Sequence, residues 1–456
     1  MSVVPGTLDT NRQPPMTVPL RHFIVALSLL LLGLGVGALV ALGHAPALAT
    51  LAHVHLLLAG WVCLTIMGAM TQFVPVWSGV GLHSRRLARL QLWPVVLGIV
   101  GFSACFLLGI LAWLPVFGGL MLVGFWLFVY NIGRTLHRVE TLDITERHFA
   151  LTLGFFLLVT VLGFLLAVDY VHPAFVDISV ARQNVIAAHA TLAVFGVVLT
   201  TVLGALYQLA TMFTQTDLHG IDQPLRRFEV TAYPSGVVLL AIGRLLGLGM
   251  VGRVGGLLLT ISLLAFSVIL ARRLIETQVD WTPMLRRYVI VALALAGWSV
   301  LTVGAWLRDP LAPAVRFGAP ATLHLLFLGV IGFVVIGTLY HIVPFIIWVH
   351  RYSDRLGFEA VPMIDDLYDS RLARLDLGLF VTGGSLLVVG DIPAVPSPVD
   401  ITASGLVFLG ALVFVGNLGL TIERHSPHSL GALLFGVGET GESTPVADSD
   451  PTETPP

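Results

Sequence analysis

Twelve long apolar runs dominate this sequence and leave little chain for anything else. A helix needs about 20 consecutive apolar residues to cross a bilayer. With 56% hydrophobic and 11% charged residues over 456 positions, the chain is too apolar for a soluble globule. The sequence therefore predicts an all-α integral membrane protein with twelve transmembrane helices. The runs cover about residues 21-43, 49-77, 90-112, 114-133, 148-169, 183-213, 228-248, 251-271, 288-307, 317-349, 372-390 and 402-422.

The segments at the two ends of the chain differ from the runs in composition. We expect a disordered cytoplasmic lead over 1-20, a twelve-helix membrane domain over 21-426 and a disordered acidic cytoplasmic tail over 427-456. The lead is polar, and the apolar run after it has no small-residue cleavage site of the signal-peptide kind. The tail contains "GETGESTPVADSDPTETPP", which is acidic, proline-rich and without apolar periodicity.

The charged residues predict an orientation. All 24 basic residues are arginine, and an entry from the cytoplasm would leave most of them on the inner side. The positive-inside rule then gives a multi-pass protein of the cell (plasma) membrane, N-in and C-in. We find no carboxylate in the middle of a span, which argues against proton pumping. The arginines expected outside are Arg182, Arg244, Arg253, Arg308 and Arg316.

Two histidines, His53 and His55, stand near the start of the second run, "LAHVHLLLAGWVCLTIMGAMTQFVPVW". The sixth run, "AHATLAVFGVVLTTVLGALYQLATMF", and the tenth, "ATLHLLFLGVIGFVVIGTLYHIVPFII", align with it without gaps. Four helices separate each copy from the next, so the sequence predicts three four-helix pseudo-repeats. The shared columns include Gly60, Gly196 and Gly329, and also Gly68, Gly204 and Gly337.

The same alignment gives two polar columns near the outer ends of these helices. The first column holds His53, His189 and Thr322, and the second holds His55, Thr191 and His324. Residues two apart on a helix lie about 200° apart around its axis, so the columns face different neighbours. Around a pseudo-threefold axis, His53 would face His324, and His55 would face His189. Thr191 and Thr322 would face each other at the third interface.

This arrangement resembles the haem-copper oxidase subunit I superfamily, which includes the large subunits of cytochrome c oxidase and nitric oxide reductase, and more distantly the NnrS-like proteins. The resemblance covers the twelve-helix frame, but its motifs are confined to helices 2, 6 and 10. It implies that His53 and His324 hold a low-spin haem, of b type, in a protein of electron transfer or haem-linked redox sensing. Haem propionates need cationic partners, and we expect Arg316 and Arg182 to supply them.

The sequence departs from the family where the catalytic centre would lie. The family holds a high-spin haem by a histidine of helix 10, and copper by histidines of helices 6 and 7. Here Thr322 and Thr191 stand at two of these positions, and helix 7 has no histidine. The protein is thus expected to be oxidoreductase-like without the binuclear centre, with no catalytic residues and without oxygen or nitric oxide reduction.

Several alternatives stay open. His55 and His189 could form a second haem site, a copper site or a hydrogen-bonded pair. The whole chain could instead be an NnrS-like haem and copper protein of nitric oxide response, or a twelve-helix transporter. Partners beyond the lipid bilayer are an electron donor or acceptor protein or a quinone, with a companion subunit and without nucleic acid. Histidines near the inner ends of helices, among them His22 and His148, are expected to be solvated.

Overall fold

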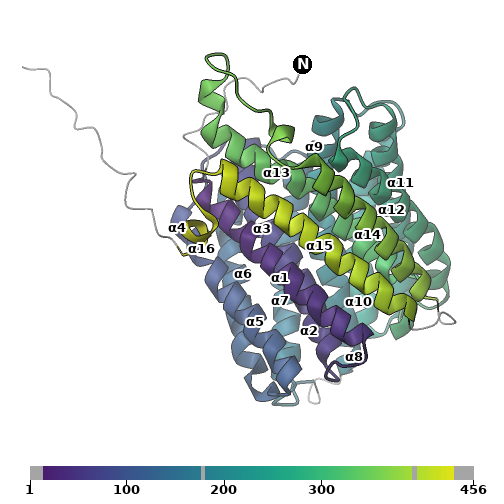
Figure 1. The fold of residues 1–456 in the computed structure, drawn as a ribbon. Helices are drawn as coiled ribbons and strands as arrows, with labels where there is room; N and C mark the ends of the chain where they lie inside the picture. The colour runs from purple at the N-terminus through teal and green to yellow at the C-terminus, as the bar shows by residue number, and fades with distance from the viewer. Residues whose placement is uncertain (1–13, 176–179, 393–397, 436–456) are drawn as a thin grey trace, which may run out of the picture.

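The computed structural model describes residues 14–175, 180–392 and 398–435. Within these residues, twelve helices are long and apolar enough to cross a membrane, which confirms a multi-pass, all-helical chain. The helices pack side by side in one bundle (Figure 1). Their bounds are α1 (Thr17–Ala41); α2, η2 and α3 (Ala49–His55, Leu56–Val62, Cys63–Ser78); α4 and α5 (Arg85–Leu90, Leu92–Leu108); η3 and α6 (Leu111–Trp113, Leu114–Leu136); α7 (Ile144–Val168); α8, η4 and α9 (Arg182–Thr191, Leu192–Leu199, Thr200–Thr214); α10 (Asp222–Leu246); α11 (Gly249–Ile275); α12 (Pro283–Arg308); η6 and α13 (Leu325–Gly332, Phe333–Arg351); α14 (Ser370–Gly390); and α15 (Pro398–His425).

The structured part of the chain is longer at both ends than the sequence predicts. Helix α1 begins at Thr17, so the last residues of the expected lead are helical. A short helix, α16 (Leu430–Phe435), follows the last span, and its Leu433 is buried and packs into the core. The rest of the expected disordered ends, residues 1–13 and 436–456, lies outside the described residues.

The spans that carry the repeated motifs form the centre of the bundle. Counted along the chain, span 2 comprises α2 to α3, span 6 comprises α8 to α9, and span 10 comprises η6 and α13. In the most apolar part of these spans, the share of buried residues is 67%, 72% and 83%. The share is only 22% in span 4 (η3 and α6) and 28% in span 11 (α14). Consecutive outer helices pack against one another, and α1 also lies along α15, which joins the first span to the last (Figure 1). Spans 2, 6 and 10 are therefore enclosed by the others.

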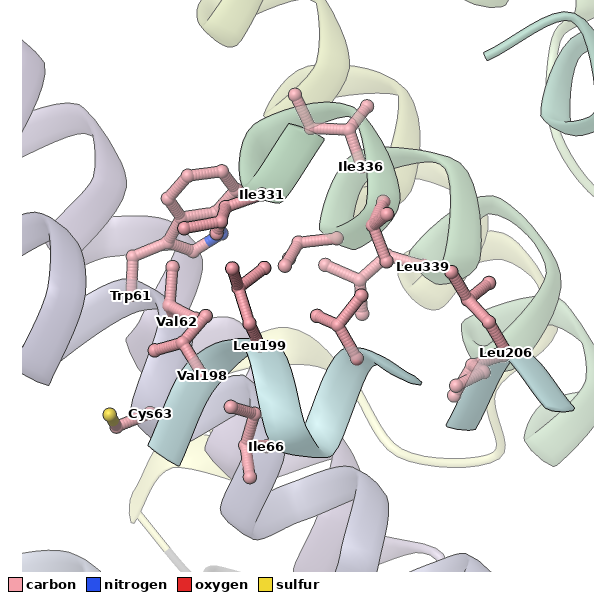
Figure 2. Packing of buried hydrophobic residues seen from close by; sticks show 14 of the residues in the cluster. Trp61, Val62, Cys63, Ile66, Val198, Leu199, Leu206, Ile331, Ile336 and Leu339 are labelled. Atoms are coloured by element: carbon pink, nitrogen blue, oxygen red, sulfur yellow. The ribbon is translucent and has the colours of Figure 1, made fainter. Parts of the chain in front are cut away.

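Large aliphatic and aromatic side chains hold the three central spans together. Figure 2 shows Trp61 and Val62 of η2 beside Val198 and Leu199 of η4, with Ile331 of η6 near Trp61. Burying such side chains is the main favourable term in packing. The two cysteines of the chain are free and buried: Cys63 belongs to this cluster and Cys105 to a smaller one near α2.

Each central span contains a π-helical segment at the same place. The segments η2, η4 and η6 begin one residue after His55, Thr191 and His324, which are the three members of the second polar column. π-Helical turns are rare and are frequent at functional sites. The backbone itself thus marks the level of the bundle where the histidines lie, which we call the histidine end.

Candidate functional site

The histidine end contains two pairs of imidazoles from separate spans. His53 and His324 lie close enough for their charges to interact, and so do His55 and His189. These are the pairs of neighbours that the two sequence columns predict. All four residues are half-buried although they lie inside the bundle.

His53 and His189 are positioned in the same way, each by a backbone carbonyl oxygen and a glycine of the preceding helix. The Nδ1 atom of His53 lies 2.7 Å from the carbonyl oxygen of Gly33, and that of His189 lies 3.0 Å from the carbonyl oxygen of Val159. One turn further on stand two glycines. A Cβ atom added at Gly37 would lie 2.6 Å from Cε1 of His53, and one at Gly163 would lie 2.8 Å from Cε1 of His189. Each ring therefore occupies space that only glycine leaves free.

The other two histidines have different anchors. His324 Nδ1 lies 2.8 Å from Oδ1 of Asp391, and the His324 backbone N–H donates to Oδ2 of the same carboxylate at 3.0 Å. Asp391 directly follows α14, so this carboxylate ties span 11 to the start of span 10. His55 Nδ1 lies 2.7 Å from the carbonyl oxygen of Leu51, and its ring packs beside Phe102 and Phe106.

These anchors determine which ring nitrogen can bind a ligand. A carbonyl or carboxylate oxygen can only accept, so Nδ1 must carry the hydrogen in all four rings, and a neutral ring then has its lone pair on Nε2. None of the four Nε2 atoms is hydrogen-bonded to a residue of the described chain. Metal-ligating histidines usually have this arrangement, in which the second nitrogen donates to an oxygen.

The surroundings suit a haem better than a bare metal ion. Among the described residues, no group of three or more His, Cys, Asp or Glu side chains could hold a metal. Two imidazoles suffice for haem, because the porphyrin brings four donors of its own and the protein supplies only axial ligands. A groove of about 230 Å³ beside His324 is lined mainly by apolar residues of α12, η6, α13 and α14, such as Ala294, Leu328 and Phe380.

The two arginines predicted to meet haem propionates have different surroundings. Arg182 Nε donates to Oδ2 of Asp169 at 2.8 Å, and its guanidinium lies 4.6 Å from the centre of the Tyr170 ring. A carboxylate of the chain therefore already pairs with Arg182. Arg316 forms no ion pair in the described chain, and its Nε is buried without a hydrogen-bond partner there. Of the two, Arg316 is the better suited to an external anionic group.

The third interface, between spans 6 and 10, is closed by protein groups. Thr191 Oγ1 donates to Ala187 and accepts a hydrogen bond of 2.7 Å from Arg244 Nη1. Thr322 Oγ1 donates to Ala319. The Arg244 guanidinium, from the last turn of α10, lies 5.4 Å from the ring centre of Trp306. These residues offer no imidazole or thiolate, so they do not fit a second haem or a copper ion.

Sequence reasoning missed a layer of buried polar residues at the opposite end of the bundle, which we call the polar end. His22 and His148 are 1% exposed, so the prediction that they are solvated is wrong. His148 Nδ1 lies 2.7 Å from the Ile144 carbonyl oxygen and its Nε2 lies 3.2 Å from Oε1 of Glu229. Tyr207 donates to the second oxygen of that carboxylate at 2.7 Å.

The same kind of contact joins the neighbouring spans. His22 Nε2 lies 3.5 Å from Nε2 of Gln91, and Arg287 forms an ion pair with Asp376, which also accepts from Tyr340. Glu229 and Asp376 are fully buried within α10 and α14, although neither lies in the middle of its span. Both stand about two turns from a helix start and at the edge of their apolar runs, where the sequence does not show that the protein buries them.

A signal for this layer is present in the repeated glycines. Added Cβ atoms at Gly68, Gly204 and Gly337 would lie 2.9, 2.5 and 3.3 Å from the Cβ atoms of His22, His148 and Arg287. The partners stand on α1, α7 and α12, each one span before the repeated helix. Extending the alignment to the preceding helix would have pointed to them.

Sequence comparison adds no relative to this description. No protein-family model matches the chain, and no curated protein matches it. Its function therefore has to be argued from the residues themselves.

Proposed function

We propose that the chain is a membrane haem protein in which His53 and His324 are the axial ligands of a low-spin, b-type haem. One observation carries the proposal: two imidazoles from spans 2 and 10 are neighbours, each with Nδ1 held by an oxygen and Nε2 free. When bound, a haem with two histidine ligands supplies reversible one-electron chemistry without an open coordination position. Electron transfer or haem-linked redox sensing is the function that suits such a site.

The residues around the pair have separate roles in this proposal. Asp391 accepts from Nδ1 of His324, and a carboxylate in that position fixes the ring and makes Nε2 more basic. Gly33 offers His53 a neutral carbonyl, which orients the ring with less effect on its basicity. The groove beside His324 gives this ring an apolar surface on the side of α12 and α14, while His53 lies outside the groove. Arg316 is the candidate partner for an anionic group of the haem.

We infer that the bundle consists of three four-helix units, as in the haem-copper oxidase subunit I superfamily that the sequence resembles. Three features recur in the units. The π-helical segments begin at equivalent positions, and equivalent glycines contact the preceding span at the polar end. At the histidine end, a histidine of the first column lies beside a histidine of the second column in two places. Under this inference two of three equivalent interfaces hold imidazole pairs. The third holds threonines and Arg244.

His55 and His189 are proposed as a second cofactor site. Their Nδ1 atoms are held by carbonyl oxygens and their Nε2 atoms are free, as in the first pair. A second haem predicts a haem-to-protein ratio near two that falls to one in His189→Ala. A copper ion predicts a ratio of one with copper found by elemental analysis. A ratio of one without copper, unchanged in the variant, would leave the pair a structural role.

The rival functions differ from the proposal in what they bind. An NnrS-like protein of nitric oxide response would also carry haem or copper, whereas a transporter would use the histidines as polar contacts and carry neither. We place the protein in the plasma membrane with both ends inside, on the strength of its arginine distribution. A redox partner, whether protein, quinone or companion subunit, belongs to the same proposal.

Three variants test the axial ligands. His53→Ala and His324→Ala should each lose the low-spin haem, because one imidazole cannot hold a six-coordinate iron. His341→Ala is the matched control: it removes another histidine of span 10, seventeen positions later, where the ring packs on Phe213 and Phe345. Haem content that is equal in all three purified variants would contradict the assignment.

A further inference from the structure

The third interface contains a buried cation whose charge no carboxylate of the described chain neutralises. Arg244 is 2% exposed. Its donors reach only neutral oxygens: Pro310 O at 3.0 Å, Thr191 Oγ1 at 2.7 Å, Arg316 O at 2.9 Å and Val315 O at 3.3 Å. Burying an unpaired charge is costly, and carbonyl dipoles offset that cost only in part.

A small, partly open cavity lies against this guanidinium. Its volume is about 20 Å³, enough for a particle the size of a water molecule or a small ion. Arg316 also lines it, and the buried Nε of Arg316 has no hydrogen-bond partner in the described chain. Two guanidinium groups therefore line the cavity. Nearby water alone would not neutralise them.

The start of α8 adds to this field. Gln183 and Asn184 line the cavity from the first turn of that helix, and the N-cap residue Ala181 has no side-chain acceptor. Helix N-termini attract anions through their free N–H groups and the helix dipole. Two guanidinium groups, two amide side chains and a helix start thus converge on one small cavity.

We propose that this cavity binds a small inorganic anion of the size of chloride. The charge of Arg244 and Arg316 selects an anion, and the volume excludes larger ions such as gluconate. The anion would complete the third interface between spans 6 and 10, where Arg244 already joins Thr191 to the loop before η6. The cavity contains none of the four paired histidines, but it shares Arg316 with the proposed haem site, so haem content is measured beside the unfolding midpoint in every variant.

Thermal unfolding of the purified full-length protein tests the site. Chloride replaces gluconate at constant ionic strength, and we expect the unfolding midpoint to rise by roughly 1–2 °C for each tenfold increase above the dissociation constant, since a ligand of the folded state stabilises it by mass action. Arg316→Gln should abolish this dependence. Arg253→Gln is the control, because Arg253 is an arginine at the same end that lies outside the cavity and donates to Leu307 and Arg308.

Two outcomes would overturn the proposal. One is a wild-type midpoint that does not change with chloride. The other is a chloride dependence that Arg316→Gln and Arg253→Gln retain equally, which would point to a general salt effect.

Discussion

The histidine end and the polar end of the bundle both place histidines in membrane-spanning helices, but they leave those histidines in different chemical states. At the polar end, His148 is buried and both ring nitrogens have partners, a carbonyl oxygen and the carboxylate of Glu229. At the histidine end, His53 and His324 are half-buried, and each uses only Nδ1. A buried histidine with both nitrogens engaged is part of the framework, whereas one with a free, oriented Nε2 is ready for a ligand.

The two ends therefore contribute to the stability of the folded protein in different ways. A buried network of hydrogen bonds and ion pairs, such as the one at the polar end, specifies how its helices pack. At the histidine end, a ligand bound to the free Nε2 lone pairs would stabilise the folded state by mass action. Variants at the polar end should therefore damage folding, and variants at the histidine end should damage binding.

The largest effect is expected at the polar end. Arg287→Met removes one partner of the fully buried ion pair with Asp376 and leaves a carboxylate without its cation. Such a change costs about 3–5 kcal/mol. We expect low yield and a strongly lowered unfolding temperature in detergent, and unaltered haem spectra in whatever folds.

A double variant sharpens that result. Arg287→Met combined with Asp376→Leu removes both charges, and replacing a buried pair by apolar residues is often nearly neutral. It should recover much of the lost stability. If the single and double variants are equally destabilised, the ion pair itself is not the cause.

A smaller effect is expected from Gly37→Ala at the histidine end. The added methyl group would lie 2.6 Å from Cε1 and 2.7 Å from Nδ1 of His53, so the ring must move. We expect weaker haem retention and a changed spectrum with little loss of folding. Gly35→Ala is the control on the same helix, because its nearest neighbour would be an atom of Phe408 at 3.9 Å. Equal haem content in both variants would mean that the position of His53 does not matter for haem.

A slight, pH-dependent effect is expected at Asp369, the N-cap of α14. Hydrogen bonds from the backbone N–H groups of Arg371 and Leu372 lower the pKa of this carboxyl. A lowered pKa stabilises the folded state above the ordinary aspartate range near pH ~3.9, and this contribution disappears as the pH falls through the lowered pKa. Asp369→Asn keeps a capping group that does not titrate. The difference in unfolding temperature between wild type and variant should thus shrink on acidification, and a constant difference would contradict the charge effect.

The sequence predicts the spans and the neighbours of the histidines well, because both depend on periodicity. An apolar run of about 20 residues can be read from the sequence, and so can the spacing of two histidines two positions apart on a helix. The anchors Gly33, Val159 and Asp391 could not be predicted, because they lie on other spans and two of them act through backbone oxygens. Arg244, expected on the outer side, is buried instead, since hydropathy does not tell which end of a helix the protein itself covers.

An absence of change is expected with carbon monoxide. A haem held by His53 and His324 has no open position, and the third interface offers Thr191 and Thr322 in place of imidazoles. The reduced spectrum should change little under carbon monoxide, and oxygen or nitric oxide should not be consumed when an artificial donor is supplied. Rapid, cyanide-sensitive oxygen consumption by the isolated protein would mean that the ligands have been assigned to the wrong spans.

The optical spectrum of the wild-type protein, purified from haem-replete cells, tests the central claim most directly. If the free Nε2 atoms of His53 and His324 are axial ligands, the reduced protein should show the bands of a six-coordinate, low-spin haem, with at least one haem per chain. A well-folded preparation that contains no haem would contradict the account.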